Sequence, residues 1–303
     1  MQAIVSGDVL TILIAVIAKI YNEMKKKSII ILSVATVVLV LAAFVTWMLW
    51  GNLAISVSKY RVESEKLPTA FDGFIIAQVS DLHNDELGEG NSRLLERLEE
   101  AEPDIIVITG DVIDRNRTDL SVAIEFVKGA AVIAPTYYVS GNHESALSQE
   151  DFALFCEDLT SVGVTVLENR SVLLEKDGEY LSLAGVGDQN FGYSPSNDDL
   201  LALKGEKAEF SILLAHRPRD FYQYATCGFD LVLSGHLHGG QFQIPFLGGL
   251  YAPSYGLFPE YDGGVYEREG SIMIVSRGVG NSSFPIRFNN PREIVIVELV
   301  VKN

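Results

Sequence analysis

Nitrogen and oxygen side chains that bind metals gather in five short motifs of this 303-residue chain. Each motif stands at or near the end of an apolar run that reads as a β-strand, and together the motifs contain every histidine of the sequence. The motif residues are Asp81 and His83, Asp111, Asn142 with His143 and Glu144, His216, and finally His236 and His238. Histidine, aspartate and asparagine are ligands that divalent transition metals prefer. The sequence therefore predicts a metal centre of the kind that serves hydrolysis.

The spacing within two motifs favours convergence of their side chains. Asp81 and His83 are two residues apart, as are His236 and His238. Residues i and i+2 at the end of a strand point to the same side, so each pair is expected to face one metal. Three glycines permit a tight exit from a strand; they are Gly110, Gly141 and Gly235. One such motif alone is more often a turn, a helix cap or a core histidine, but five in order favour a dinuclear site.

The order Asp-x-His, Gly-Asp-x-x-Asp, Gly-Asn-His-Glu, a single His and Gly-His-x-His resembles that of the calcineurin-like metallophosphoesterase superfamily. The last motif continues as Gly-His-x-His-Gly-Gly-Gln at 235–241, which resembles the small membrane-anchored phosphoesterases of that superfamily. The resemblance covers roughly residues 74–299. It implies a mixed α/β fold, a four-layer sandwich of two mixed β-sheets flanked by helices.

The resemblance also implies which residues hold two divalent metal ions, with Mn²⁺, Zn²⁺, Fe²⁺ or Ni²⁺ as the candidates. The first metal would be bound by Asp81, His83, Asp111 and His238. The second would be bound by Asp111, Asn142, His216 and His236. A bridging carboxylate suits two cations about 3.5–4 Å apart, because its two oxygens reach both and its charge offsets their repulsion. Neutral Asn142 leaves the metals electrophilic, and the pair would aim a bridging hydroxide at phosphorus, in line with the leaving oxygen.

His143 resembles the histidine of the family that protonates the leaving oxygen or stabilises the transition state, and Glu144 is expected to orient it. The alternative is a histidine that only positions Asn142. Asp114 is expected to support the site or a turn rather than to bind a metal. Three arginines are further candidates for binding a phosphate oxygen, although arginines are common at surfaces; they are Arg115, Arg217 and Arg277.

The net charge of −17 is unevenly distributed. Residues 1–50 contain four lysines and two acidic residues, a charge of +2, which leaves −19 for 51–303. Such a domain repels phosphate backbones, so we expect no nucleic-acid partner. No linker or repeat divides residues 51–303, which fits one large domain. Cys156 and Cys227 lie outside any metal-binding spacing and are expected to be packed thiols, with a disulfide as the alternative.

Residues 28–50 form a run of 23 residues without a charge, directly after three lysines. At about 1.5 Å per residue, such a helix crosses a bilayer core of about 30 Å. We expect a single-pass anchor at 24–50, a polar connector at 51–70 and the main domain at 71–303. Lysines before the run favour a cytoplasmic N-terminus and an extracytoplasmic domain at the cell membrane. A cleaved signal peptide is the alternative.

The N-terminal extension, residues 1–23, contains a second apolar stretch at 9–18 that is too short to span a bilayer. It would lie on the membrane surface, form a weak hydrophobic segment, or precede a natural start at Met24. Met-Lys-Lys-Lys followed by an apolar run is itself an export signal, which favours the last reading.

Strands and helices are expected to alternate after the connector, which predicts βαβ units and a parallel sheet. The expected helices span 92–100, 121–129 and 150–161. The expected strands span 74–80, 104–109, 136–140, a hairpin of 171–175 with 180–185, 210–215, 229–234, 271–276 and 294–300. The motifs follow the carboxyl ends of these strands, where open α/β sheets place their sites.

The leading interpretation is a metal-dependent phosphodiesterase that acts on a phosphoester substrate. Within enzymes, the alternative is a phosphomonoesterase or a pyrophosphatase acting on nucleotides or sugar nucleotides. The alternative of another class is a catalytically silent metal-binding membrane module, whose mark would be a lost ligand. Anchoring and the aromatic loop at 239–261 favour a lipid-linked substrate or an envelope precursor, although the loop also fits simple packing over the sheet edge.

Overall fold

The computed structural model describes residues 5–253, 255–281 and 285–302 and divides into two compact units at Trp50. The first unit contains all but the last three residues of α1, a helix that runs from Val5 to Leu53. Its residues 8–50 contain neither glycine nor proline, so nothing in that stretch breaks the helix. Within α1, Thr11–Leu53 is long and apolar enough to cross a membrane. The apolar stretches 9–18 and 28–50 therefore belong to one continuous helix.

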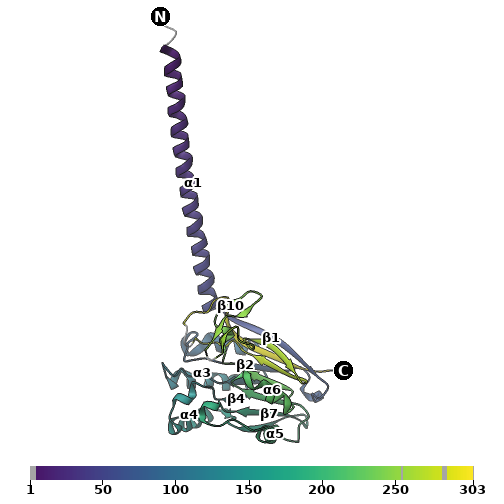
Figure 1. Cartoon of the computed structure of the whole chain (residues 1–303). Coiled ribbons are helices and arrows are strands. Elements are labelled where there is room, and N and C mark those ends of the chain that lie inside the picture. The colour runs from purple at the N-terminus through teal and green to yellow at the C-terminus, as the bar shows by residue number, and fades with distance from the viewer. Residues whose placement is uncertain (1–4, 254, 282–284, 303) are drawn as a thin grey trace. The chain divides into compact units, whose positions relative to one another are not determined.

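Two six-stranded sheets form the second unit, residues 51–303 (Figure 1). The strand order of the first sheet is β1-β16-β2-β3-β4-β5. Its strands are β1 (Ile55–Ser64), β2 (Phe74–Val79), β3 (Ile105–Thr109), β4 (Thr136–Val139), β5 (Val164–Val166) and β16 (Arg292–Val301). Strands β2 to β5 are parallel neighbours, as the predicted βαβ units require, whereas β16 runs antiparallel to β2. The connecting helices are α2 (Ser92–Glu99), α3 (Leu120–Ile133) and α4 (Gln149–Ser161).

The second sheet has the order β14-β15-β9-β8-β7-β6. Its strands are β6 (Arg170–Lys176), β7 (Glu179–Val186), β8 (Ser211–Ala215), β9 (Leu231–Ser234), β14 (Gly264–Arg268) and β15 (Ser271–Val275). Helices α5 (Asn197–Lys204) and α6 (Phe221–Thr226) accompany it. Strands β6 and β7 form the predicted hairpin, and β7, β8, β9 and β15 are parallel neighbours.

Alternate residues of the strands supply three separate cores. Ile76 of β2 and Leu214 of β8 belong to one buried cluster, which lies between the two sheets. Ala77, the next residue of β2, instead belongs to the cluster that includes residues of α2, α3 and α4. Leu213 of β8 packs with residues of α5 and α6. Because neighbouring residues face opposite sides, both sheets are covered on both faces, and the predicted four-layer sandwich is confirmed.

The segment 51–70 differs from the expected polar connector. Its residues 55–64 form β1, which pairs in parallel with β16 over all ten residues. Polar residues alternate with residues such as Val62, which is buried, so the strand suits the edge of a sheet. The sequence places β1 more than 200 residues from its partner, which is why the segment alone does not reveal the pairing. Cys156 and Cys227 are both free thiols.

Candidate metal centre

All five motifs follow strands near the middle of the two sheets. Asp81 and His83 follow β2, and Asp111 follows β3. Asn142 and His143 follow β4, whereas the last three histidines follow β8 and β9 of the second sheet; they are His216, His236 and His238. The side chains thus meet where the carboxyl ends of parallel strands from both sheets come together. All of these residues are buried except His236, which is half-buried.

The backbone at the motifs is not the extended strand that the spacing suggests. Strand β2 ends at Val79, and both Asp81 and His83 adopt positive φ values, 57° and 51°. Asp111, His236 and His238 are also left-handed, with φ of 53°, 78° and 49°. Asp and His tolerate this region better than most residues, but each instance still costs of order 1–3 kcal/mol. The paired side chains therefore converge through left-handed turns held by the surrounding fold, rather than through strand alternation.

Two of the predicted glycines are needed for close approach. A Cβ at Gly141 would collide with the Asp111 carboxylate, and a Cβ at Gly235 would collide with Ser80 and Asp81. The motif loops can thus pack against one another only because these positions have no side chain.

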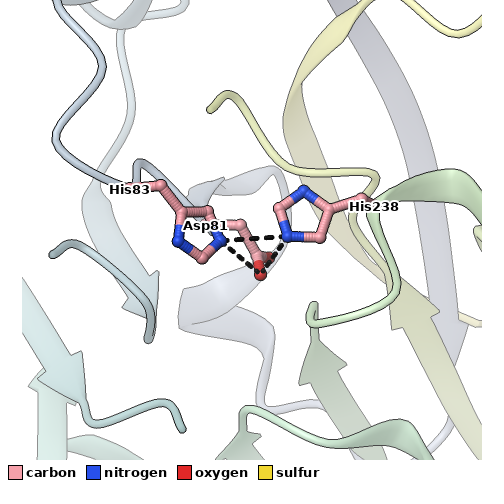
Figure 2. A group of neighbouring side chains, drawn as sticks. All are labelled: Asp81, His83 and His238. Carbon is pink, nitrogen blue, oxygen red and sulfur yellow. Dashed lines mark hydrogen bonds and ion pairs between the residues drawn. The ribbon is translucent and has the colours of Figure 1, made fainter. Parts of the chain in front are cut away.

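The first cluster consists of Asp81, His83 and His238 (Figure 2). The Nε2 atoms of the two rings are 3.0 Å apart. Oδ1 of Asp81 lies 3.7 Å from the His83 Nε2 and 3.4 Å from the His238 Nε2. Figure 2 shows the two rings directed at each other and at the carboxylate, so three metal-binding atoms surround one point.

The second cluster consists of Asp111, His216 and His236, with Asn142 beside them. The His216 Nε2 is 3.2 Å from the Asp111 Oδ2, 3.1 Å from the His236 Nδ1 and 3.2 Å from the Asn142 Oδ1. The same Asp111 Oδ2 lies 3.7 Å from the Nε2 of His83. Asp111 therefore stands between the two clusters, as a bridging ligand must.

The position of the proton on the His216 ring leaves its other nitrogen able to bind a cation. The His216 Nδ1 lies 2.8 Å from the carbonyl oxygen of Thr109, an acceptor, so Nδ1 carries the proton and the neutral ring has a lone pair on Nε2. That Nε2 then faces a carboxylate oxygen, an amide oxygen and another ring nitrogen. Each of these three atoms can have a free lone pair. Such a concentration of acceptors is satisfied by a divalent cation, and the residues present therefore fit a dinuclear metal site.

Without a cation, the carboxylates of the site draw a proton to His216 instead, in the place that a metal would take. Burial opposes a charge on His216, but the carboxylates of Asp111, Asp81 and Asp188 together outweigh burial and raise the pKa of His216 to about 10. Burial, with the charge of His216, lowers the pKa of His236 to about 3. Burial likewise lowers the pKa of His238 to about 3. Despite its own burial, Asp81 has a pKa below the usual range because of His238 and His83. The site thus attracts positive charge while two of its rings stay neutral, the form that binds metals.

His143 lies beside the first cluster, with its ring centroid 4.4 Å from that of His83. The backbone N–H of Arg115 donates to the His143 Nδ1 at 3.1 Å, so the proton of the neutral ring lies on Nε2. Its own backbone N–H donates to the Asp111 Oδ1 at 2.7 Å. Asp114, predicted to be a supporting residue, is buried with its Oδ2 3.7 Å from the His83 Nδ1 and 4.0 Å from the His143 Nδ1.

Glu144 has contacts other than those expected. Its carboxylate accepts hydrogen bonds from the backbone N–H groups of Gly141, Asp111, Val112 and Ile113, at 2.7–3.3 Å. Burial, and then Asp111, raise the pKa of this carboxyl to about 7. Glu144 therefore ties the loop after β4 to the loop after β3, and so fixes the position of Asp111 through its backbone.

The three arginine candidates already have partners. Arg217 forms a bidentate pair with Asp188, at 2.6 and 2.9 Å. Arg277 donates to Glu293 at 2.7 Å, and Arg115 donates to the carbonyl of Asn142 at 2.6 Å. Their contacts support the loops of the site. Beside His216 and Arg217 opens a cavity of about 170 Å³.

One supporting residue has no signal in the sequence. Arg287 is fully buried, and its Nη2 lies 3.4 Å from the His238 Nδ1. It also donates to the carbonyl of Arg277 at 2.8 Å and to the Asn281 side chain at 3.0 Å. Arg287 stands nearly fifty residues after the last motif, so no spacing connects it with the candidate metal ligands.

Comparison with known proteins places these features in one family. Residues 74–240 match the family model of the calcineurin-like phosphoesterases. The uncharacterized metallophosphoesterase YkuE of Bacillus subtilis is 31% identical over 254 residues, 82% of this chain and 87% of the relative. The phosphodiesterase YaeI of Escherichia coli is 30% identical over 205 residues, 66% of this chain and 72% of the relative.

A third relative is a transmembrane protein with a metallophosphoesterase domain from Danio rerio. It is 30% identical over 253 residues, 79% of this chain and 56% of the relative. The matched region contains three groups of histidine and aspartate that could hold a metal ion, among them the two clusters described above, and the family supports a metal-dependent phosphoester hydrolase. The chain therefore belongs to the calcineurin-like phosphoesterase family, as its five motifs predict.

Proposed function

We propose that the domain is a dinuclear metal-dependent phosphodiesterase. One divalent metal would be held by Asp81, His83, Asp111 and His238, and the other by Asp111, Asn142, His216 and His236. The observation that carries the proposal is the position of the Asp111 Oδ2, which lies within 3.7 Å of a ring nitrogen of each cluster. The identity of the metals, from Mn²⁺, Zn²⁺, Fe²⁺ and Ni²⁺, is left to experiment.

When bound, the two metals would supply an activated water and positive charge at the phosphoryl group. The chain's own residues then have distinct tasks. Asp111 would bind both metals, while Glu144 holds the Asp111 backbone. His143 presents its Nε2 proton beside the first cluster, because the Arg115 N–H holds Nδ1. That proton would hydrogen bond to a phosphoryl oxygen or to the leaving oxygen.

Two features favour diesters over monoesters. A monoester carries a second negative charge at neutral pH, yet Arg217 and Arg277 are already paired with Asp188 and Glu293. A diester also has a second organic substituent that needs space. The cavity beside His216 offers about 170 Å³, and the charges on its wall are paired, Arg217 with Asp188 and Arg219 with Asp220. A neutral polar substituent would fit such a lining.

The test compares bis(4-nitrophenyl) phosphate with 4-nitrophenyl phosphate, using the full-length chain in detergent with each candidate metal. We expect a higher kcat/KM for the diester. The Asp111→Asn variant, purified in the same way, serves as the control for contaminating phosphatases. An equal or higher kcat/KM for the monoester would favour the alternative, a phosphomonoesterase or a pyrophosphatase, over a diesterase.

We further propose that α1 anchors the protein as a single-pass protein of the cell membrane, with the phosphoesterase domain outside the cytoplasm. The length and composition of the helix support the anchoring, as does the transmembrane relative. The lysines before residue 28 support the extracytoplasmic position of the domain. Protease added to intact spheroplasts is expected to digest the domain. Protection of the domain until lysis would reverse the topology.

An anchored enzyme meets substrates at a surface, and the domain's charge of −19 repels polyanions such as nucleic acid. We therefore propose a phosphodiester or pyrophosphate within a lipid or an envelope precursor as the natural substrate.

A further inference from the structure

The segment after His238 is unlike the rest of its domain. Residues 239–259 contain no charged side chain, although the domain carries −19 in total. The segment forms two small hairpins, β10 (Gln243–Ile244) with β11 (Gly248–Gly249) and β12 (Tyr251–Ala252) with β13 (Gly256–Leu257). It thus offers an uncharged surface directly next to two of the metal-binding histidines.

Large apolar side chains project from these hairpins into solvent. Phe246 is fully exposed, with a relative accessibility of 106%, and Leu247 and Leu257 are each 66% exposed. Phe258 is 52% exposed. We call these four residues the exposed hairpin residues. Single exposed apolar residues are ordinary, but several on neighbouring hairpins indicate a contact surface.

The turn that presents Phe246 is better suited to glycine. The Leu247 N–H donates to the Ile244 carbonyl at 3.0 Å, which closes a β-turn with Pro245 at its second position. Phe246 occupies the third position with φ of 69°, where such turns favour glycine. Phe258 also has a positive φ, 53°. Bulky residues are uncommon in this region, so folding alone does not account for an aromatic residue at the turn.

The hairpins stand close to Asn52, which lies at the start of the domain. The N–H of Gln243 in β10 donates to the carbonyl of Phe288 at 2.9 Å. The preceding residue, Arg287, exchanges two hydrogen bonds with the Asn52 side chain, at 2.8 and 2.9 Å. Asn52 belongs to the last turn of α1. The two hairpins are also joined, because the N–H of Phe258 donates to Leu250 and that of Leu250 donates to Phe242.

We propose that the exposed hairpin residues dock into the interface of the bilayer that α1 crosses, and this proposal rests on the proposed anchoring. The end of a spanning helix must lie near the bilayer surface, and Asn52, which is bonded to Arg287 beside β10, lies only two residues after Trp50. Aromatic and aliphatic side chains favour the interface, whereas the acidic remainder of the domain is repelled by anionic lipids. Docking would hold the metal ligands His236 and His238 near the headgroups. The substrate class that fits is an amphiphile whose phosphoester lies at the membrane surface.

The test uses the full-length chain in nanodiscs of phosphatidylcholine and phosphatidylglycerol, with one chain per disc. In a Cys156→Ser, Cys227→Ala background, an environment-sensitive fluorophore is attached at Leu247→Cys and, as a control, at Leu201→Cys. Leu201 is an exposed apolar residue of α5, at the end of the domain opposite to β10 (Figure 1). Lipids carrying a nitroxide are expected to quench the label at 247 and not the label at 201.

Adding Phe246→Gly should reduce the quenching at 247 while thermal stability stays equal or rises, because glycine suits the turn. The same change should lower hydrolysis of a disc-embedded phosphodiester but not of soluble bis(4-nitrophenyl) phosphate, and Leu201→Ser should lower neither. Equal quenching at 247 and 201 would overturn the docking proposal. Quenching that appears only with two chains per disc would also overturn it, since the exposed hairpin residues would then contact a second copy. Quenching needs no turnover, so failure of the proposed activity is distinguishable from failure of docking.

Discussion

Asp111→Asn is expected to abolish hydrolysis and to weaken both metals together. The Asp111 Oδ2 lies 3.2 Å from the His216 Nε2 and 3.7 Å from the His83 Nε2. Asparagine removes the negative charge that offsets repulsion between two cations and leaves one oxygen in place of two. Loss of a partner outside the ligand set typically lowers metal affinity about 10–100-fold. Loss of a bridging ligand should exceed that.

Elemental analysis of the purified variant tests this prediction, together with a diester assay. Asp119→Asn provides a matched control, because it makes the same substitution at an exposed residue that only caps α3. The control should keep its metals and its turnover. If Asp111→Asn retained two metals per chain and near wild-type activity, the assignment of Asp111 as the bridge would be wrong.

His143→Ala is expected to have a different effect, with metal content near two per chain and a slower reaction. If His143 acts as a proton donor, the rate should fall by roughly 10²–10⁴-fold. The geometry places the available proton on Nε2, since the Arg115 N–H occupies Nδ1. The loss should shrink for a nitrophenolate leaving group, which needs little protonation.

A series of diesters whose leaving groups differ in pKa separates the possible roles of His143. A dependence of the rate loss on leaving-group pKa supports proton donation. An equal loss across the series would indicate that the ring positions Asn142 or binds a phosphoryl oxygen throughout. Loss of metal from the variant would contradict the view that His143 is not a ligand.

The motifs predict which residues form the site because each motif follows the carboxyl end of a strand. The carboxyl ends of these strands lie together where the two sheets adjoin. Asp81 and His238 are more than 150 residues apart in sequence, yet Nε2 of His238 is 3.4 Å from Oδ1 of Asp81. The sequence predicts the backbone conformation of the motifs less well. The separation of two residues between Asp81 and His83 suggests an extended backbone, whereas both residues have positive φ. That conformation depends on packing against other loops, which spacing does not encode.

The hydrogen-bond partners of charged residues are also not revealed by the sequence alone. Glu144 stands next to His143, and adjacency suggested that it orients the ring. Its carboxylate instead accepts four backbone N–H groups from two loops. Arg287 and the pairing of β1 with β16 depend on contacts between distant parts of the chain. Such pairings follow from the assembled fold, and a single sequence gives no spacing by which to find them.

The most direct test of the central claim is a metal titration of the chelator-treated, full-length protein, followed simultaneously by bound metal and by hydrolysis of bis(4-nitrophenyl) phosphate. A dinuclear phosphodiesterase should be inactive without metal and should reach full activity only as the second equivalent binds. Full activity with one equivalent, or activity that is independent of metal, would contradict the account.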